Sequence, residues 1–251
     1  MLIPGRFAGF LLGQGSVISA LAVWIRESFI VTELNTVEIE TGPSPQASII
    51  WMHGLGADAH DFEPAVPMLN LSSGQAVRFV FPNAPVRPVT MNGGMPMRAW
   101  YDLLAAERDA AEDEAGVRES AASIEELIKK ERERGIAANR IVVAGFSQGG
   151  AMALFTALRF PERLAGVLAL STYLPIADAV KEERSEVNLD IPIFMAHGQS
   201  DEVIEFNFAR NSRMKLTKMD YDVEWKEYQM AHSVIPEELA DVRAFLDKVL
   251  S

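Results

Sequence analysis

The sequence contains no cysteine among its 251 residues. Disulfide bonds, thiolate catalysis and cysteine-ligated metal sites are therefore excluded. The absence of disulfides fits a reducing compartment, so we expect a cytoplasmic protein. Basic residues are also scarce: 23 stand against 35 acidic residues, which gives a net charge of −12. Because nucleic-acid binding usually needs a basic face, we expect no nucleic-acid partner.

Histidine is scarce as well, with only four in the chain. His53 and Asp58 could ligate a metal ion, but no second histidine clusters with them, so we expect no metal site and no cofactor. Apolar residues, by contrast, make up 49% of the chain and supply ample core. The length suits one α/β domain, and no repeat or linker divides it.

A glycine-rich motif connects a predicted strand to a predicted helix. Residues 141–144 are apolar and mostly β-branched, as in a buried strand, and residues 151–158 are good helix formers. Between them, Gly145, Ser147 and Gly149 fit the pattern Gly-x-Ser-x-Gly. A tight turn from strand to helix strains the central serine and presents its hydroxyl at the end of a sheet. This context predicts that Ser147 is a nucleophile.

A serine is a poor nucleophile at neutral pH and needs a base and an orienting acid. In sheets of this kind the acid and then the histidine follow the serine in the chain, which leaves two of the four histidines. His232 lies in a loop between a predicted strand and a predicted helix, and Asp201 lies in the loop after the strand that ends at His197. We therefore predict His232 as the base, Asp201 as its orienting acid, and a structural role for His197.

Four motifs together resemble the phospholipase/carboxylesterase family, which lies within the α/β-hydrolase fold. They are Gly-Phe-Ser-Gln-Gly-Gly at 145–150, His-Gly-Leu-Gly-Ala-Asp at 53–58, His-Gly-Gln-Ser-Asp at 197–201 and Met-Ala-His at 230–232. The segments 81–85 and 100–102 also resemble the family pattern. The resemblance runs from about Ser48 to the C-terminus and is nearest to the bacterial carboxylesterase branch.

The resemblance implies a fold and an oxyanion hole. We expect residues 31–251 to form a single-domain α/β-hydrolase, with a mostly parallel central sheet and helices on both faces. The oxyanion of the reaction is expected to be bound by the backbone N–H groups of Leu55 and Gln148. Members of this family often pair as homodimers, so we expect the same here.

Residues 82–98 are rich in proline, glycine and methionine and show little periodicity. We predict a long irregular loop that walls an acyl pocket, with Met91 and Met95 as adaptable apolar surface. A solvated loop with incidental methionines is the alternative. Trp100 and Tyr173, at the same predicted edge of the sheet, complete the expected substrate-binding residues.

The remaining elements are predicted from the spacing of apolar residues and from residues that interrupt helices. Residues 112–134 have apolar positions at helical spacing and form the clearest predicted helix. Residues 60–71 carry helical signals that Pro64 and Pro67 limit. Residues 176–188 are polar and are interpreted as a short surface excursion.

Residues 1–30 have no counterpart in the family pattern, and three interpretations stay open. A mis-assigned start, with the true start near Val31, comes first; a signal peptide over residues 1–22, which would mean export, comes second. A membrane anchor comes third, because small and polar residues at 13–16 interrupt the apolar run. Membrane contact is expected only if this extension is native.

Three functions follow from these residues and from what the resemblance implies. The first is a serine carboxylesterase that hydrolyses small acyl esters through an acyl-enzyme. The second is an acyl-protein thioesterase or lysophospholipase that acts on long acyl chains. The third is a non-catalytic α/β-hydrolase-like binding protein whose triad is vestigial. We favour the first from the sequence.

Overall fold

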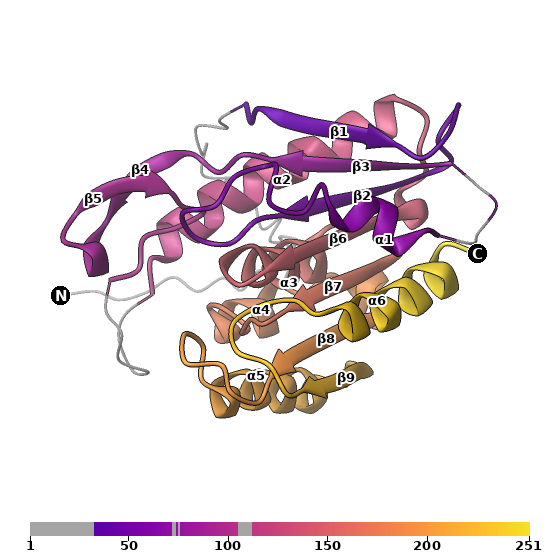
Figure 1. Cartoon of the computed structure of the whole chain (residues 1–251). Coiled ribbons are helices and arrows are strands. Elements are labelled where there is room, and N and C mark those ends of the chain that lie inside the picture. The colour runs from indigo at the N-terminus through magenta and orange to yellow at the C-terminus, as the bar shows by residue number, and fades with distance from the viewer. Residues whose placement is uncertain (1–32, 72–73, 75, 105–111) are drawn as a thin grey trace, which may run out of the picture.

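A seven-stranded sheet forms the centre of the molecule, in the order β1-β3-β2-β6-β7-β8-β9 (Figure 1). The computed structural model describes residues 33–71, 74, 76–104 and 112–251, so the expectations for residues 1–30 lie outside it. β1 pairs antiparallel with β3, and every other neighbouring pair is parallel. The strands are β1 (Thr36–Glu40), β2 (Ala47–Met52), β3 (Val77–Pro82), β6 (Ile141–Phe146), β7 (Gly166–Leu170), β8 (Ile193–Gly198) and β9 (Val223–Tyr228).

Helices cover both faces of this sheet, as expected. One face packs on α2 (Glu114–Glu133), α3 (Gln148–Arg159), α4 (Ala177–Glu183) and α5 (Phe206–Lys218). The other face packs on α1 (Ala65–Leu69) and α6 (Pro236–Val249), which lie in front of the sheet in Figure 1. The inner strands β2, β6, β7 and β8 are buried almost throughout because helices cover them on both sides. None of the described helices is long and apolar enough to span a bilayer.

The chain order along the sheet reverses beside β2. From β2 the chain continues outward to β3, and it later returns to the other side of β2 as β6 and proceeds to β9. Parallel sheets form their ligand crevice at such a reversal, beyond the carboxyl ends of the two strands. Ser147 follows β6 directly, and Leu55 lies shortly after β2. The topology therefore brings both to one place.

The segment 82–98 is not an irregular loop, which corrects the sequence prediction. It contains a two-stranded antiparallel hairpin of β4 (Val86–Val89) and β5 (Met95–Arg98), joined through the short 3-10 turn η1 (Thr90–Asn92). Pro88 lies opposite Pro96 in the register. Proline cannot donate to a ladder and is tolerated in such an edge ribbon, so the residues that argued against strands occupy a hairpin outside the main sheet.

Two other segments also differ from expectation. The helix predicted over residues 60–71 is reduced to the five residues of α1, which begins directly after Pro64. The excursion at 176–188 contains α4 and a 3-10 turn, η3 (Glu186–Asn188). Val180 of α4 is fully buried in the core, and Ile176, Ala177 and Ala179 pack beside it, so a few apolar contacts anchor a segment whose composition is mostly polar.

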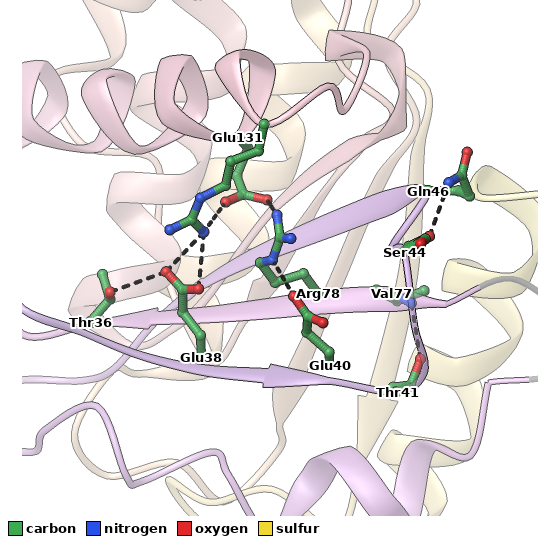
Figure 2. Close-up of polar contacts among 10 residues, drawn as sticks. Thr36, Glu38, Glu40, Thr41, Ser44, Gln46, Val77, Arg78 and Glu131 are labelled. Carbon is green, nitrogen blue, oxygen red and sulfur yellow. Dashed lines mark hydrogen bonds and ion pairs between the residues drawn. The ribbon is translucent and has the colours of Figure 1, made fainter.

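An ion-pair cluster around the buried Glu131 ties α2 to the β1–β3 edge of the sheet (Figure 2). Glu131 of α2 is 1% exposed, and its two carboxylate oxygens accept from Arg78 at 2.9 Å and from Arg134 at 2.8 Å. Each arginine has a second partner on β1: Glu40 for Arg78 at 3.0 Å, and Glu38 for Arg134 at 2.9 Å. The cluster therefore links one helix to the two outermost strands.

Candidate active site

Ser147 occupies a sharp turn between β6 and α3. Its backbone, at φ 55° and ψ −122°, lies in a region that a residue with a side chain rarely adopts. Close packing explains the flanking glycines: a Cβ on Gly145 would lie 2.2 Å from the backbone of Gly149, and one on Gly149 would lie 2.4 Å from the carbonyl oxygen of Met52. The sequence thus lets three backbones approach so that the turn can form.

Three side chains from three loops converge at the carboxyl edge of the sheet. The Nε2 atom of His232 lies 2.9 Å from Oγ of Ser147, and its Nδ1 atom lies 2.7 Å from Oδ2 of Asp201. Because a carboxylate only accepts, Nδ1 of His232 carries the hydrogen and Nε2 is free to accept the serine proton. The structure brings together all three residues that the sequence singled out.

Asp201 is held as an anion. Burial opposes its ionisation, but hydrogen bonds from His232 and from the backbone N–H groups of Ile204 and Val203 outweigh it and keep the pKa of Asp201 below its ordinary value. The two N–H groups both donate to Oδ1, at 2.8 and 2.9 Å, and leave Oδ2 for His232. The acid is therefore fixed in charge and in orientation.

The two predicted oxyanion donors come from different segments, the loop after β2 and the start of α3. Gln148 is the first residue of α3, whose positive end faces this site. The loop that carries Leu55 is held by Gly56, whose N–H donates to the carbonyl of Arg98 in β5 at 2.8 Å. Within the described residues, neither the N–H of Leu55 nor that of Gln148 donates to a protein acceptor. Both remain available to a substrate oxygen.

The side chain of Gln148 holds this arrangement from behind. Its amide accepts from the N–H of Trp100 at 2.8 Å and donates to the carbonyl of Tyr101 at 2.7 Å. The indole N–H of Trp100 donates to the carbonyl of His53 at 2.9 Å, at the start of the Leu55 loop. Segment 100–101 therefore connects the two halves of the predicted oxyanion hole.

We compared the sequence with models of known protein families. The model of the family described as phospholipase/carboxylesterase matches residues 34–250. The chain belongs to the phospholipase/carboxylesterase family. Its fold is that of an α/β-hydrolase, and it is a serine hydrolase that acts on ester bonds.

Individual relatives of this phospholipase/carboxylesterase family member carry more specific names. Acyl-protein thioesterase 1 of Mycosarcoma maydis is 40% identical over 225 residues, which cover 84% of this chain and 94% of the relative. Acyl-protein thioesterase 1 of Neurospora crassa is 41% identical over 213 residues, which cover 81% of this chain and 87% of the relative. The crystal structure of Zea mays acyl-protein thioesterase 2 matches with a TM-score of 0.78 and 30% identity, over 86% of this chain and 99% of that one.

The four residues expected to bind substrate in this family member differ from one another in exposure. Met91 and Met95, on the β4–β5 hairpin, are 45% and 61% exposed, so both present apolar surface to solvent. Trp100 is completely buried and uses its indole N–H on His53. This corrects its predicted role, because such a side chain supports the site from behind and offers no surface. Tyr173 is half-buried, and its hydroxyl lies 2.8 Å from that of Tyr101.

The structure adds supporting residues that sequence reasoning missed. Thr172 is buried and its hydroxyl donates to the carbonyl of Ser147 at 2.6 Å. His53 is buried, accepts from the N–H of Ala84 at 3.1 Å through Nε2, and has its pKa lowered by burial, so it is a neutral structural histidine. Among the described residues, no three His, Asp or Glu side chains gather as a metal site would require. No spacing rule points to Thr172, because its contact with Ser147 is made across two strands.

Proposed function

We propose that this family member hydrolyses long-chain acyl thioesters on proteins, with Ser147, His232 and Asp201 as its catalytic residues. The observation that carries the catalytic part of this proposal is a continuous chain of hydrogen bonds, called the relay below. It runs from Oγ of Ser147 through His232 to Asp201, at 2.9 and 2.7 Å. The substrate class is supported by the names of the relatives at 40% and 41% identity, which are acyl-protein thioesterases. These relatives favour the long-chain alternative over the small-ester carboxylesterase that the sequence alone favoured.

The proposed reaction proceeds through an acyl-enzyme. The oxygen of Ser147 forms a bond to the acyl carbonyl carbon while its proton passes to Nε2 of His232. Collapse of the tetrahedral adduct breaks the bond from carbon to sulfur, and His232 returns the proton to the departing thiol. Water then attacks the acyl-enzyme with His232 again as the base, and the acid is released with free Ser147.

Charge that develops on the carbonyl oxygen is stabilised by the N–H groups of Leu55 and Gln148. Each such donor is typically worth about 3 kcal/mol in the transition state. Both contributions come from the backbone, so they depend on how the two loops are held more than on which side chains occupy them. The bridge made by Gln148 and Trp100 supports that requirement.

The surface offered for an acyl chain is also a proposal. The exposed apolar side chains of Val86, Met91 and Met95 lie on a hairpin whose Arg98 carbonyl binds the Leu55 loop. Flexible methionine side chains adapt to a long apolar chain. A substrate acyl group would thus extend from Ser147 toward β4 and β5.

The catalytic assignment is tested with a fluorophosphonate probe and the variant Ser147→Ala. We expect the wild type and a matched variant of an exposed nearby serine, Ser200→Ala, to be labelled, and Ser147→Ala to be neither labelled nor active while its unfolding transition is unchanged. Labelling of Ser147→Ala, or an unlabelled wild type, would refute the relay and favour a binding protein with a vestigial triad.

The substrate class is tested with three substrates on the purified chain. We expect kcat/KM for an S-palmitoylated peptide to exceed that for a p-nitrophenyl butyrate ester and that for a lysophosphatidylcholine. Higher kcat/KM for the short ester would restore the small-ester carboxylesterase, and preference for the lysolipid would indicate a lysophospholipase. The homodimer and the cytoplasmic location stay predictions, which sedimentation and cell fractionation can test.

A further inference from the structure

His197 is a fully buried histidine that the proposed reaction does not use. It lies near the end of β8, and its side chain is 0% exposed. Two rings enclose it: Phe206 of α5, with centroids 6.3 Å apart, and Trp225 of β9, nearly parallel at 6.4 Å. An apolar residue would suit that setting, so a polar side chain there needs a reason.

The polar contacts of His197 all lead to the catalytic acid. Its Nε2 atom lies 2.8 Å from the carbonyl oxygen of Ile204 and 3.3 Å from Oδ2 of Asp201. Ile204 in turn donates its N–H to Oδ1 of Asp201 at 2.8 Å. One peptide unit thus binds the carboxylate through its nitrogen and the histidine through its oxygen.

This geometry fixes the protonation of His197. A carbonyl oxygen only accepts, so Nε2 carries the hydrogen. Within the described residues, Nδ1 is buried without a hydrogen-bond partner. Burial lowers the pKa of His197, and a proton on Nδ1 would have no acceptor. His197 is therefore neutral, with its single hydrogen directed at the 201–204 turn.

The charged groups that act on His197 come from two loops. Asp201, on its own loop, favours the protonated form of His197, and His232 from the β9–α6 loop disfavours it. Toward α5 and β9 the neighbours are the rings of Phe206 and Trp225, and the indole N–H of Trp225 is taken by Glu227. The electrostatic partners of His197 are thus two of the three relay residues.

We propose that His197 is a positioning residue for the hydrolytic reaction. Its Nε2–H anchors the 201–204 turn, so that Asp201 presents Oδ2 to Nδ1–H of His232 rather than rotating with a loose loop. The inference rests on the proposed catalytic roles of Ser147, Asp201 and His232. It assigns a task to the first residue of the motif His-Gly-Gln-Ser-Asp, which the sequence interpreted as structural only.

Two polar substitutions of His197 separate the effect of its hydrogen bond to Ile204 from the effect of its ring packing. His197→Gln places an amide N–H near the position of Nε2, whereas the shorter side chain of His197→Asn does not reach Ile204. Phe206→Leu is the matched control, because it perturbs the packing against the His197 ring but removes no polar contact to Asp201. All three are measured for kcat, KM and the pH profile of kcat/KM, with unfolding followed in parallel.

We expect His197→Asn to lose about 10- to 100-fold in kcat with KM little changed, as for a misplaced catalytic group. A loosened Asp201 stabilises the positive charge on His232 less, so the acid limb of the profile should move to lower pH. His197→Gln should restore most of the kcat and the position of the limb. Phe206→Leu should leave the limb where it is.

Several results would overturn the inference. They are an unshifted limb in His197→Asn, a shift to higher pH, a Gln variant as impaired as the Asn variant, and a Phe206→Leu variant that reproduces the full effect. If His197→Asn does not fold, nitrogen-15 histidine spectra of the wild type decide instead: we expect the neutral Nε2–H form of His197 at pH 7, and the Nδ1–H form or the cation would refute it. Failure of the wild type to label with fluorophosphonate would refute the proposed function rather than this inference.

Discussion

The strained backbone of Ser147 is held by three hydrogen bonds. Its N–H donates to Leu170 at 2.9 Å, and its carbonyl accepts from the N–H of Ala151 at 3.1 Å and from the hydroxyl of Thr172 at 2.6 Å. Such a conformation costs about 1–3 kcal/mol and persists only where its surroundings impose it. Thr172 is the one side chain among these partners, so it can be changed without altering the backbone.

We predict that Thr172→Val lowers both stability and kcat. The substitution keeps the shape but removes the hydroxyl, and loss of such a bond costs about 1 kcal/mol in unfolding free energy. The less constrained turn should reduce kcat by roughly the same free energy, or about fivefold. Chemical denaturation and steady-state kinetics measure the two. Thr172→Ser keeps the hydroxyl and should behave like the wild type; an impaired Ser variant beside a normal Val variant would show that the methyl group matters instead.

Gln148 contributes an N–H to the predicted oxyanion hole and a side chain to its support. We predict that Gln148→Met lowers kcat about 10-fold or more with a small change in KM. The variant misaligns a backbone N–H whose hydrogen bond to the oxyanion forms mainly in the transition state. Methionine fills the same volume but leaves Trp100 N–H and the Tyr101 carbonyl unpaired. Gln148→Ala serves as the comparison: a nearly normal Met variant beside an impaired Ala variant would assign the role to packing.

The first turn of α6 contains an acid that the fold keeps protonated. Glu238 is fully buried, and burial raises its pKa to about 8, which the backbone N–H of Ile235 offsets only in part. The unfolded chain loses this proton near the ordinary value of about 4.5. Between those two pH values the unfolded state releases a proton that the folded state retains, so stability falls as pH rises through that window and levels off above it.

We therefore predict that Glu238→Gln stabilises the protein at neutral pH, by roughly 2–4 kcal/mol at pH 7. Below pH 4.5 the gain should vanish, because glutamic acid is then neutral in both states. Denaturant unfolding at pH 4, 6, 7 and 8.5 measures the difference. Glu237→Gln, one residue earlier and exposed, should show none of this dependence. A gain that does not change with pH would contradict the assignment of the proton to Glu238.

At the level of elements, the sequence predicts those whose period is carried by buried apolar residues. The apolar run at 141–144 and the helix at 112–134 appear in β6 and as α2, because a continuous apolar run and helical spacing report directly on burial. The hairpin of β4 and β5 was missed, since proline within a short run argues against a strand. Its pairing depends on Val86 meeting Arg98 across a turn, which no local pattern encodes.

The residues of the candidate site also divide into those that the sequence predicts and those that it does not. Chain order and loop placement suffice for Ser147, Asp201 and His232, because parallel strands end at one edge and their loops must meet there. The supports of that relay could not be read from the sequence. Thr172 lies just after β7 and His197 lies in β8, and their contacts depend on how these strands are set beside β6 and on how loop 201–204 turns back.

At the scale of the whole molecule, two regions of the sheet have different tasks. The carboxyl ends of β2, β6 and β8 lead to the catalytic loops, where strain, burial and unpaired N–H groups gather. The ion-pair cluster of Glu131 lies at the β1–β3 side of the sheet, with Arg78 near the amino end of β3 (Figure 2). Stability and activity should therefore respond separately to changes in the two regions.

We predict that Glu131→Gln destabilises the fold while it leaves kcat/KM unchanged. The neutral side chain leaves Arg78, whose own side chain is 12% exposed, with half of its compensation, and removing one partner of a buried pair costs about 3 kcal/mol or more. Denaturant unfolding and hydrolysis of the preferred substrate measure the two effects. Glu133→Gln, exposed on the same helix end, should change neither. A parallel fall in activity at temperatures where the variant is fully folded would show that the two regions are coupled, for example through α2, whose Ser120 donates its hydroxyl to the carbonyl of Trp100.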